Sequence, residues 1–425
     1  MIRHGDTVNA GFWNNTSDFY KPEVKTFDAK KKFPKDYRFM FERLREKAGF
    51  IDETICRVGE ILLQKHSLEE PSGFLQAMND QFPSLGRVCC DSEGRLNANS
   101  LLLQGTQDLS RGKALPMDVS QVKEYSLFPG QVIHTNVTNP SGTKLVAHTI
   151  TSDATPALAP FATKLREDDT MHMVVACGPY TTNDNLSYEP FRDLLDYIGK
   201  NRPHLVILCG PFVDSKQSQI DECNTNGESF DDIFNRLLRM LNDLLTDLPM
   251  TQVILQACTR DVHHRFIYPT PEFKIDANPR IISVPDPAIL NIDGVILGMT
   301  STDVLFHLGK EEICFPPRSG DRIRRLATHL LQQQSFYPLY PPSEEMNIDF
   351  EQLEAMAQLE IQPHIMITPS DLMHFFKDIN GGLVLNPQRL SKGAGGGVFA
   401  RLAVQGTSSG QAKASKQVVG EIVRI

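Results

Sequence analysis

Residues 173–180 read MVVACGPY, and residues 205–214 read LVILCGPFVD. Each stretch opens with at least four apolar residues in succession and then turns through a Gly-Pro pair. Further apolar runs follow at 253–255 (VIL) and 294–297 (GVIL). Strands that are apolar at every position are typical of a sheet covered on both faces, with helices connecting the strands. These runs therefore predict an α/β domain.

The segments between and after these strands complete that prediction. Helical spacing of apolar residues predicts three connecting helices, at 191–200, 231–245 and 321–333. The chain is expected to close with strands at 383–385, 398–404 and 417–425. The Gly- and Ser-rich residues 406–414 are expected to form a hairpin tip.

The first part of the chain follows a different pattern. Helical spacing runs from Tyr37 to His66, where Gly49 is expected to end one helix and Asp52 to cap the next. Short strands separated by Gly-, Pro- and Asn-rich turns are then predicted at 87–90, 100–103, 131–133 and 144–147. Such a series is typical of a small barrel of the oligonucleotide/oligosaccharide-binding (OB) type.

These patterns predict two domains after a short polar segment. Residues 1–36 carry few periodic apolar positions and are expected to be a lead-in. Residues 37–155 are assigned to the helices and the OB-like barrel, and residues 165–425 to the α/β domain. Pro156 and Pro160 mark the linker between the two.

Composition excludes several classes of protein. The chain has 425 residues and a net charge of −9, which argues against a protein that grips nucleic acid mainly through phosphates. The longest basic run, Lys30–Lys32, is expected to be a solvated loop. The eight cysteines include no Cys-x-x-Cys pair, which is typical of reduced thiols inside a cell. We find neither an apolar run long enough for a membrane helix nor a secretory signal.

In open α/β sheets, functional residues gather in the loops that follow the strands. The order and spacing of these loops resemble those of the calcineurin-type metallophosphoesterases. Active members of that family read Asp-x-His, Gly-Asp-x-x-Asp, Gly-Asn-His-Asp and Gly-His-x-His, and these side chains hold two divalent metals. This sequence departs from that pattern at most of the corresponding positions, which are Cys177, Pro179, Pro211, Asp214, Thr259, Arg260, Asp261, Asn386 and Pro387.

The residues at these positions indicate whether the loops could bind metal ions. Asp214 and Asp261 are retained, but Pro179 and Pro211 have no ligand atom in their side chains. Arg260 would place a fixed positive charge where a metal ion should lie. We therefore predict a degenerate metal site with no catalytic residue, no bound metal and no cofactor.

Other residues permit a second interpretation. His263 and His264 lie near Asp261 and could form a mononuclear metal site or an acid–base pair, but satisfied polar loop residues are the expectation. Asp303 and His307 have helical ligand spacing, yet a helix cap and a helix-face histidine are expected.

Three further features are expected to have structural roles. Cys177 and Cys209 end apolar strands and are expected to be inert buried thiols. Residues 393–397 are expected to be a Gly-rich connection, since no Gly-Lys-Ser/Thr follows them. In the barrel region Tyr125 and Phe128 are expected to be packing residues, so direct binding of single strands by the barrel is not predicted.

Several separated strings closely resemble the accessory B subunits of DNA polymerase α. They cover residues 85–425 in order, and they include KEYSLFPGQ at 123–131, VVACGPYTT at 174–182, TSTDVLFHLG at 300–309, FYPLYPP at 336–342 and LNPQRL at 385–390. Members of that family usually carry a further N-terminal helical module, which this sequence is expected to lack.

The resemblance implies a non-catalytic scaffold in the nucleus. Such a protein binds the zinc-bearing C-terminal domain of the catalytic polymerase subunit and, through the complex, primase; DNA is reached only indirectly. It supports the start of RNA–DNA primers. Three alternatives stay open: the accessory subunit of another replicative polymerase, an active phosphoesterase with atypical ligands, and a nucleic-acid-binding module that acts alone.

Overall fold

The computed structural model describes residues 3–4, 20–34, 36–92, 94–166, 169–276, 278–318, 320–406 and 414–425. These residues form two compact units, each assembled from separate stretches of the chain. We call residues 1–37, 158–303 and 363–425 the sheet unit, and residues 38–157 and 304–362 the barrel unit. Each unit is described by itself.

A seven-stranded sheet forms one layer of the sheet unit. Its strands, in spatial order, are β1 (Arg3–His4), β22 (Val418–Arg424), β21 (Val398–Gln405), β9 (Thr170–Cys177), β10 (Leu205–Cys209), β11 (Gln252–Gln256) and β12 (Ile281–Val284). The strands from β9 to β12 run parallel, and β21 pairs antiparallel with β9. The predicted strands at 173–176, 205–208, 253–255, 398–404 and 417–425 are therefore confirmed, with small differences at their ends.

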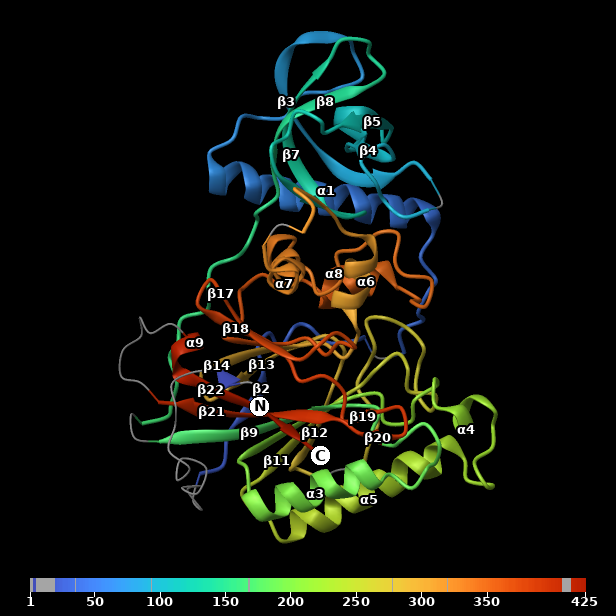
Figure 1. The fold of residues 1–425 in the computed structure, drawn as a ribbon, viewed down its shortest axis with the longest axis vertical. Helices are drawn as coiled ribbons and strands as arrows, with labels where there is room; N and C mark the ends of the chain where they lie inside the picture. Colours follow the sequence, from blue (N-terminus) through green and yellow to red (C-terminus); the bar gives the residue numbers. More distant parts are fainter. Residues whose placement is uncertain are drawn as a thin grey trace. The chain divides into compact units, whose positions relative to one another are not determined.

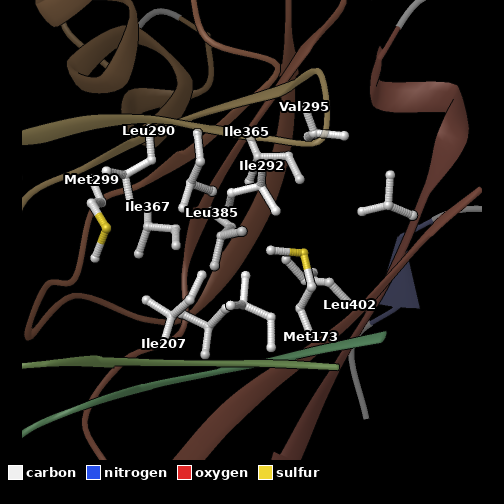
Figure 2. Packing of buried hydrophobic residues seen from close by; sticks show 14 of the residues in the cluster. Met173, Ile207, Leu290, Ile292, Val295, Met299, Ile365, Ile367, Leu385 and Leu402 are labelled. Atoms are coloured by element: carbon white, nitrogen blue, oxygen red, sulfur yellow. The ribbon is translucent and has the colours of Figure 1, made fainter. Parts of the chain in front are cut away.

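A six-stranded sheet forms the second layer. Its order is β17 (Phe375–Ile379), β18 (Gly382–Asn386), β16 (Ile365–Ile367), β14 (Val295–Met299), β13 (Ala288–Ile292) and β2 (Val24–Thr26). Figure 2 shows the apolar side chains that fill the space between the sheets, with Met173 and Ile207 on one side and Leu290 and Ile365 on the other. The unit is thus a sandwich, as the phosphoesterase resemblance implies.

The outer face of the seven-stranded sheet is covered by two long helices, α3 (Glu189–Asn201) and α5 (Phe230–Thr246) (Figure 1). Along β9, Val175 points into the space between the sheets, whereas Val174 packs with the helices. Both faces of the strand are buried, which explains its unbroken apolar sequence. Ser229 and Asp232 cap the start of α5 reciprocally, so this predicted helix begins where its sequence indicates.

The barrel unit contains a closed five-stranded barrel. Its order is β3 (Met78–Cys90), β4 (Leu101–Gln104), β5 (Ala114–Asp118), β8 (Leu145–Thr151) and β7 (Val132–Asn139), with the short helix α2 (Gln107–Ser110) after β4. Helix α1 (Leu44–His66) lies along the barrel, and its Val58 and Leu62 pack with Leu85 and Val132. The prediction of an OB-like barrel is confirmed.

Two sequence-based expectations about this unit need correction. Gly49 does not end a helix, because α1 continues through it to His66. Residues 304–362 pack with the barrel unit, whereas the predicted division placed them in the α/β domain. They form α6 (Val304–Glu311), β15 (Ile313–Phe315), the predicted α7 (Arg322–Gln332) and α8 (Phe350–Met356). Residues 304–362 are joined to the barrel region through β15, which pairs with β6 (Tyr125–Leu127).

The remaining short segments belong to the sheet unit. They are α4 (Ser218–Asp221), β19 (Ser391–Lys392), β20 (Gly395–Gly396) and α9 (Ala414–Gln417). The lead-in expected at 1–36 contributes β2, which pairs with β13. The predicted hairpin tip falls mostly on residues 407–413, which lie outside the described residues. Within the described ranges, no helix combines the length and the apolar character needed to cross a membrane.

Candidate functional site at the strand ends

The loops that follow β9 and β10 meet at the carboxyl ends of these two neighbouring strands. Cys177 and Cys209 are paired in register at the ends of these strands, so the Gly-Pro turns after them lie side by side. Gly178 donates a backbone hydrogen bond to the Cys209 carbonyl oxygen at 2.9 Å. A Cβ atom at position 178 would lie 1.9 Å from the Pro211 carbonyl oxygen, so only glycine fits there. Gly178 is thus in close backbone contact with Pro211 of the neighbouring turn.

Arg260, from the loop after β11, neutralises Asp214. Its Nε lies 2.9 Å from one carboxylate oxygen of Asp214, and its Nη2 contacts the other. The Asp214 side chain is only 5% exposed, so its carboxylate is shielded from water in this bidentate ion pair, whereas the Arg260 side chain is 22% exposed. The carboxylate that the phosphoesterase pattern would assign to a metal is therefore bonded to a guanidinium group.

Asp261 is buried beside this pair. One carboxylate oxygen accepts hydrogen bonds from the backbone N–H groups of Phe212 at 2.5 Å and Val213 at 2.9 Å. Burial raises the pKa of Asp261 to about 8, against the effect of these two bonds. Its other oxygen lies 2.6 Å from where a Cβ of Gly210 would be, so glycine is required there too. Asp261 thus fixes the loop after β10 through the backbone N–H groups of that loop.

A second arginine, Arg389, joins loops that are far apart in the sequence. Its buried guanidinium donates to the Gly178 carbonyl oxygen at 3.3 Å and to Asp371 Oδ1 at 2.9 Å. It also lies 3.6 Å from Asp303 Oδ2. Burial lowers the pKa of Arg389, but Asp303 and Asp371 outweigh this and hold it above the usual range. Sequence reasoning missed this residue, although a basic side chain two positions after Pro387 was a readable signal.

Asn386 has a structural place at the end of β18. Its amide oxygen accepts hydrogen bonds from the backbone N–H groups of Ser370 at 2.9 Å and Gln388 at 2.8 Å. Its amide nitrogen donates to the carbonyl oxygens of Ser370, Leu372 and Met373 at 3.1–3.3 Å. All of its bonding capacity is used by the backbone, and none is left for a metal.

The residues present do not fit two divalent cations. The two arginines bring positive charge to the loops, where they neutralise Asp214, Asp303 and Asp371. Thr259 is buried beside Arg260 and offers no charge. Across the described residues, no three His, Cys, Asp or Glu side chains are grouped so that they could hold a metal ion. The side chains at the strand ends therefore bond these loops to one another and stabilise them.

The two histidines after Asp261 differ from each other. His264 Nε2 lies 2.7 Å from the Pro271 carbonyl oxygen, which confirms the expectation of a satisfied polar residue. His263 contradicts that expectation, because neither ring nitrogen has a hydrogen-bond partner among the described residues. Its ring stacks on Phe234 at 4.1 Å between centroids and on Phe273 at 5.3 Å. Burial lowers the pKa of His263 to about 3, so the ring packs as a neutral aromatic group.

The other candidates are structural. Cys177 and Cys209 are fully buried, as expected for core thiols, and burial raises the pKa of Cys209. His307 bonds to Tyr337 Oη at 3.1 Å and Glu345 Oε1 at 2.9 Å. Residues 393–397 belong to the β19–β20 hairpin, which confirms a Gly-rich connection.

Comparison with known proteins identifies the family. A family model for the B subunit of DNA polymerase alpha/epsilon matches residues 173–377, and one for the OB domain of the DNA polymerase alpha B subunit matches residues 48–152. The B subunit of DNA polymerase alpha from Rattus norvegicus is 39% identical over 398 residues. This chain belongs to the family of DNA polymerase α B subunits. The resemblance in the sequence strings is thereby confirmed.

The family match covers most of this chain but only part of its relatives. The rat protein matches 92% of this chain, and the match spans 66% of the rat protein itself. The Drosophila melanogaster relative is 35% identical, over 77% of this chain and 53% of that protein. A solved structure, Vps29 complexed with zinc from Entamoeba histolytica, covers 60% of this chain at 11% identity. The TM-score of this match is 0.27, and the match covers 98% of the Vps29 chain.

Proposed function

We propose that this protein is a non-catalytic accessory subunit of the DNA polymerase α–primase complex. The observation that carries the proposal is membership of the B subunit family, with 39% identity to the rat relative over 92% of this chain. In this role the chain binds the C-terminal, zinc-bearing domain of the catalytic subunit in the nucleus. Primase is reached through the same complex, and the assembly starts RNA–DNA primers.

The strand-end loops support the non-catalytic part of the proposal. Asp214 is engaged by Arg260, and Pro179 and Pro211 offer no ligand atom. We propose that the nine positions named from the phosphoesterase pattern are the remains of a metal site. The fold then serves as a rigid support for partner binding, because its former ligands are replaced by bonds within the chain.

Binding to the catalytic subunit is tested by co-purification. The full chain is mixed with the C-terminal region of the catalytic subunit of DNA polymerase α and, in parallel, with the corresponding regions from DNA polymerases δ and ε. We expect a stoichiometric complex with the α region alone. A complex with another polymerase in place of α would contradict the assignment and favour the accessory subunit of a different replicative polymerase.

The absence of catalysis is tested separately. Purified protein is incubated with Mn²⁺ or Zn²⁺ and a chromogenic phosphodiester, and its metal content is measured by mass spectrometry. We expect no hydrolysis above a heat-denatured control and no stoichiometric metal. Hydrolysis that is lost in an Asp214→Asn variant would show that the loops are an active site and would overturn the non-catalytic assignment.

A further inference from the structure

Two aromatic rings are stacked on the ribbon formed by β6 and β15 in the barrel unit. Phe315 and Tyr125 are opposite each other in register, and their ring centroids lie 5.9 Å apart with 22° between the planes. Tyr125 is half-buried, whereas Phe315 is 45% exposed. The outer ring of the pair therefore presents an apolar surface to solvent, with the Tyr125 ring packed against it.

Basic side chains gather along the chain next to this pair. The exposed ones are Arg95, Lys123, Arg318, Arg322 and Arg324. Arg95 reaches the ribbon, because its Nη2 donates to the Glu312 carbonyl oxygen at 3.2 Å. Arg322 donates to the Gly309 carbonyl oxygen at 2.6 Å, and this bond to a neutral acceptor does not neutralise the charge of the guanidinium group.

Fewer acidic groups oppose them. Glu124, Glu311, Glu312 and Asp321 are acidic residues in the same stretches, and Glu312 is already paired with Arg325. The five basic side chains therefore outnumber the three remaining carboxylates. This excess is local, because the whole chain carries a net charge of −9. A positive cluster on an acidic protein favours an anionic ligand at that place.

A hydrogen-bonded network around Glu312 connects the ribbon to helix α7. Glu312, next to β15, accepts hydrogen bonds from Ser126 Oγ at 2.7 Å and from Arg325 Nε at 2.6 Å. His329 Nε2 lies 3.1 Å from the same carboxylate oxygen. This network ties β6, β15 and α7 together, so the strand that carries Phe315 and the helix that carries Arg322 and Arg324 are connected before any ligand arrives.

We propose that the β6–β15 ribbon binds single-stranded nucleic acid. A base stacks on Phe315, and the arginines at 318, 322 and 324 hold the flanking phosphates. An exposed ring among cationic side chains is the combination that binds single strands without sequence preference. The ribbon lies outside the closed barrel, so this site differs from an OB groove. It also departs from the expectation that DNA is reached only indirectly, and it does not rest on the proposed scaffold role.

The test uses the full chain and a fluorescein-labelled oligodeoxythymidine of about 16 nucleotides. Fluorescence anisotropy is measured from about 50 to 200 mM salt. We expect Phe315→Ala to weaken binding about tenfold or more, and Phe315→Tyr to keep most of the affinity. The matched control is Phe266→Ala, which removes a ring that is 55% exposed on the sheet unit.

The charge contribution is tested with a double variant. Arg318→Ala with Arg324→Ala should reduce the slope of log affinity against log salt by about 1.4, since each phosphate contact on a single strand adds about 0.7. Lys30→Ala with Lys32→Ala removes the same charge from exposed positions in the sheet unit and should leave the slope unchanged. Thermal melting checks that every variant is folded.

Three results would overturn the proposal. The first is no binding by the wild-type chain at about 50 mM salt. The second is an equal loss of affinity in the ribbon variants and their controls, which would indicate diffuse charge. The third is unchanged nucleic-acid binding by Phe315→Ala together with loss of a polymerase subunit from the purified complex, which would make the ribbon a protein interface.

Discussion

Arginine side chains supply the positive charge that faces the carboxylates at the strand ends. A divalent cation needs several ligands with lone pairs, whereas a guanidinium group brings its own charge and donates in a fixed plane. Arg260 engages one carboxylate, and Arg389 engages two from different loops. The loops are thus closed by bonds that need no ion from solution.

The first prediction concerns Arg389. Arg389→Met should lower the free energy of unfolding by about 3 kcal/mol, because Asp303 would lose its buried cationic partner. Chemical denaturation at neutral pH measures this. Arg192→Met, at an exposed position of α3, is the matched control and should change the free energy of unfolding by less than about 0.5 kcal/mol. Equal stability of the two variants would show that the Arg389 pairs contribute nothing.

The second prediction concerns His263. Its pKa is lowered to about 3, so the folded protein loses stability as pH falls from the ordinary histidine range toward 3. His263→Phe should remove this loss, since phenylalanine keeps the stack with Phe234 and Phe273 and has no unpartnered nitrogen. Urea unfolding at pH 7 and pH 5 should show a smaller difference for the variant. In contrast, His264→Phe should destabilise, because it breaks the bond to Pro271.

At the scale of elements, helix α1 shows how packing overrides a local signal. Gly49 costs about 1 kcal/mol relative to alanine inside a helix, which is why its position suggested an end. The helix continues because residues beyond it, such as Ile55, Val58 and Leu62, are fully buried. The stability of a helix in a protein comes mainly from such tertiary packing.

The third prediction follows from this difference. Gly49→Ala should raise the free energy of unfolding by about 1 kcal/mol, because a Cβ there meets nothing within 4 Å. Gly59→Ala in the same helix should destabilise, since its Cβ would lie 2.3 Å from a Leu85 side-chain carbon. Thermal melting of both variants compares the two positions directly. A destabilised Gly49→Ala variant would mean that the glycine has another role.

At the scale of the molecule, both units are built from stretches that are distant in sequence. The barrel unit needs residues 304–362, because Gln333 accepts from the Val132 backbone N–H at 2.7 Å and Phe128 packs on His329 at 4.9 Å. The sheet unit likewise needs residues 363–425 to supply β16, β18 and β21. Removing either late stretch would open a core.

The fourth prediction tests the connection within the barrel unit. Burial would raise the pKa of Glu312, but hydrogen bonds from His329, Arg325 and Ser126 outweigh it and lower the pKa to about 2. The carboxylate therefore stabilises the fold above the ordinary glutamate pKa, and this contribution is lost as pH falls toward 2. Glu312→Gln should lower the free energy of unfolding at pH 7 by about 3 kcal/mol and weaken its decrease below pH 4.5. An unchanged acid profile would contradict this.

Several parts of the fold could be predicted from the sequence because each has a local pattern. Runs such as Leu205–Cys209 are apolar at every position, and a sheet covered on both faces is the arrangement that buries them. The short strands between Gly-rich turns predicted the barrel for a similar reason. The order of the loops after the strands was enough to predict where Asp214, Arg260 and Asp261 would gather, although not how they bond.

By itself, the sequence determined the fold class, the family and the fact that the side chains of Pro179 and Pro211 have no ligand atom, because these depend on residue type and order. Only the tertiary structure decided that Arg389 closes the strand-end loops, that His263 packs without hydrogen bonds, and that Phe315 lies on Tyr125. Each of these involves residues distant in sequence or an environment shaped by several elements. Such contacts depend on how the chain packs, which no local periodicity records.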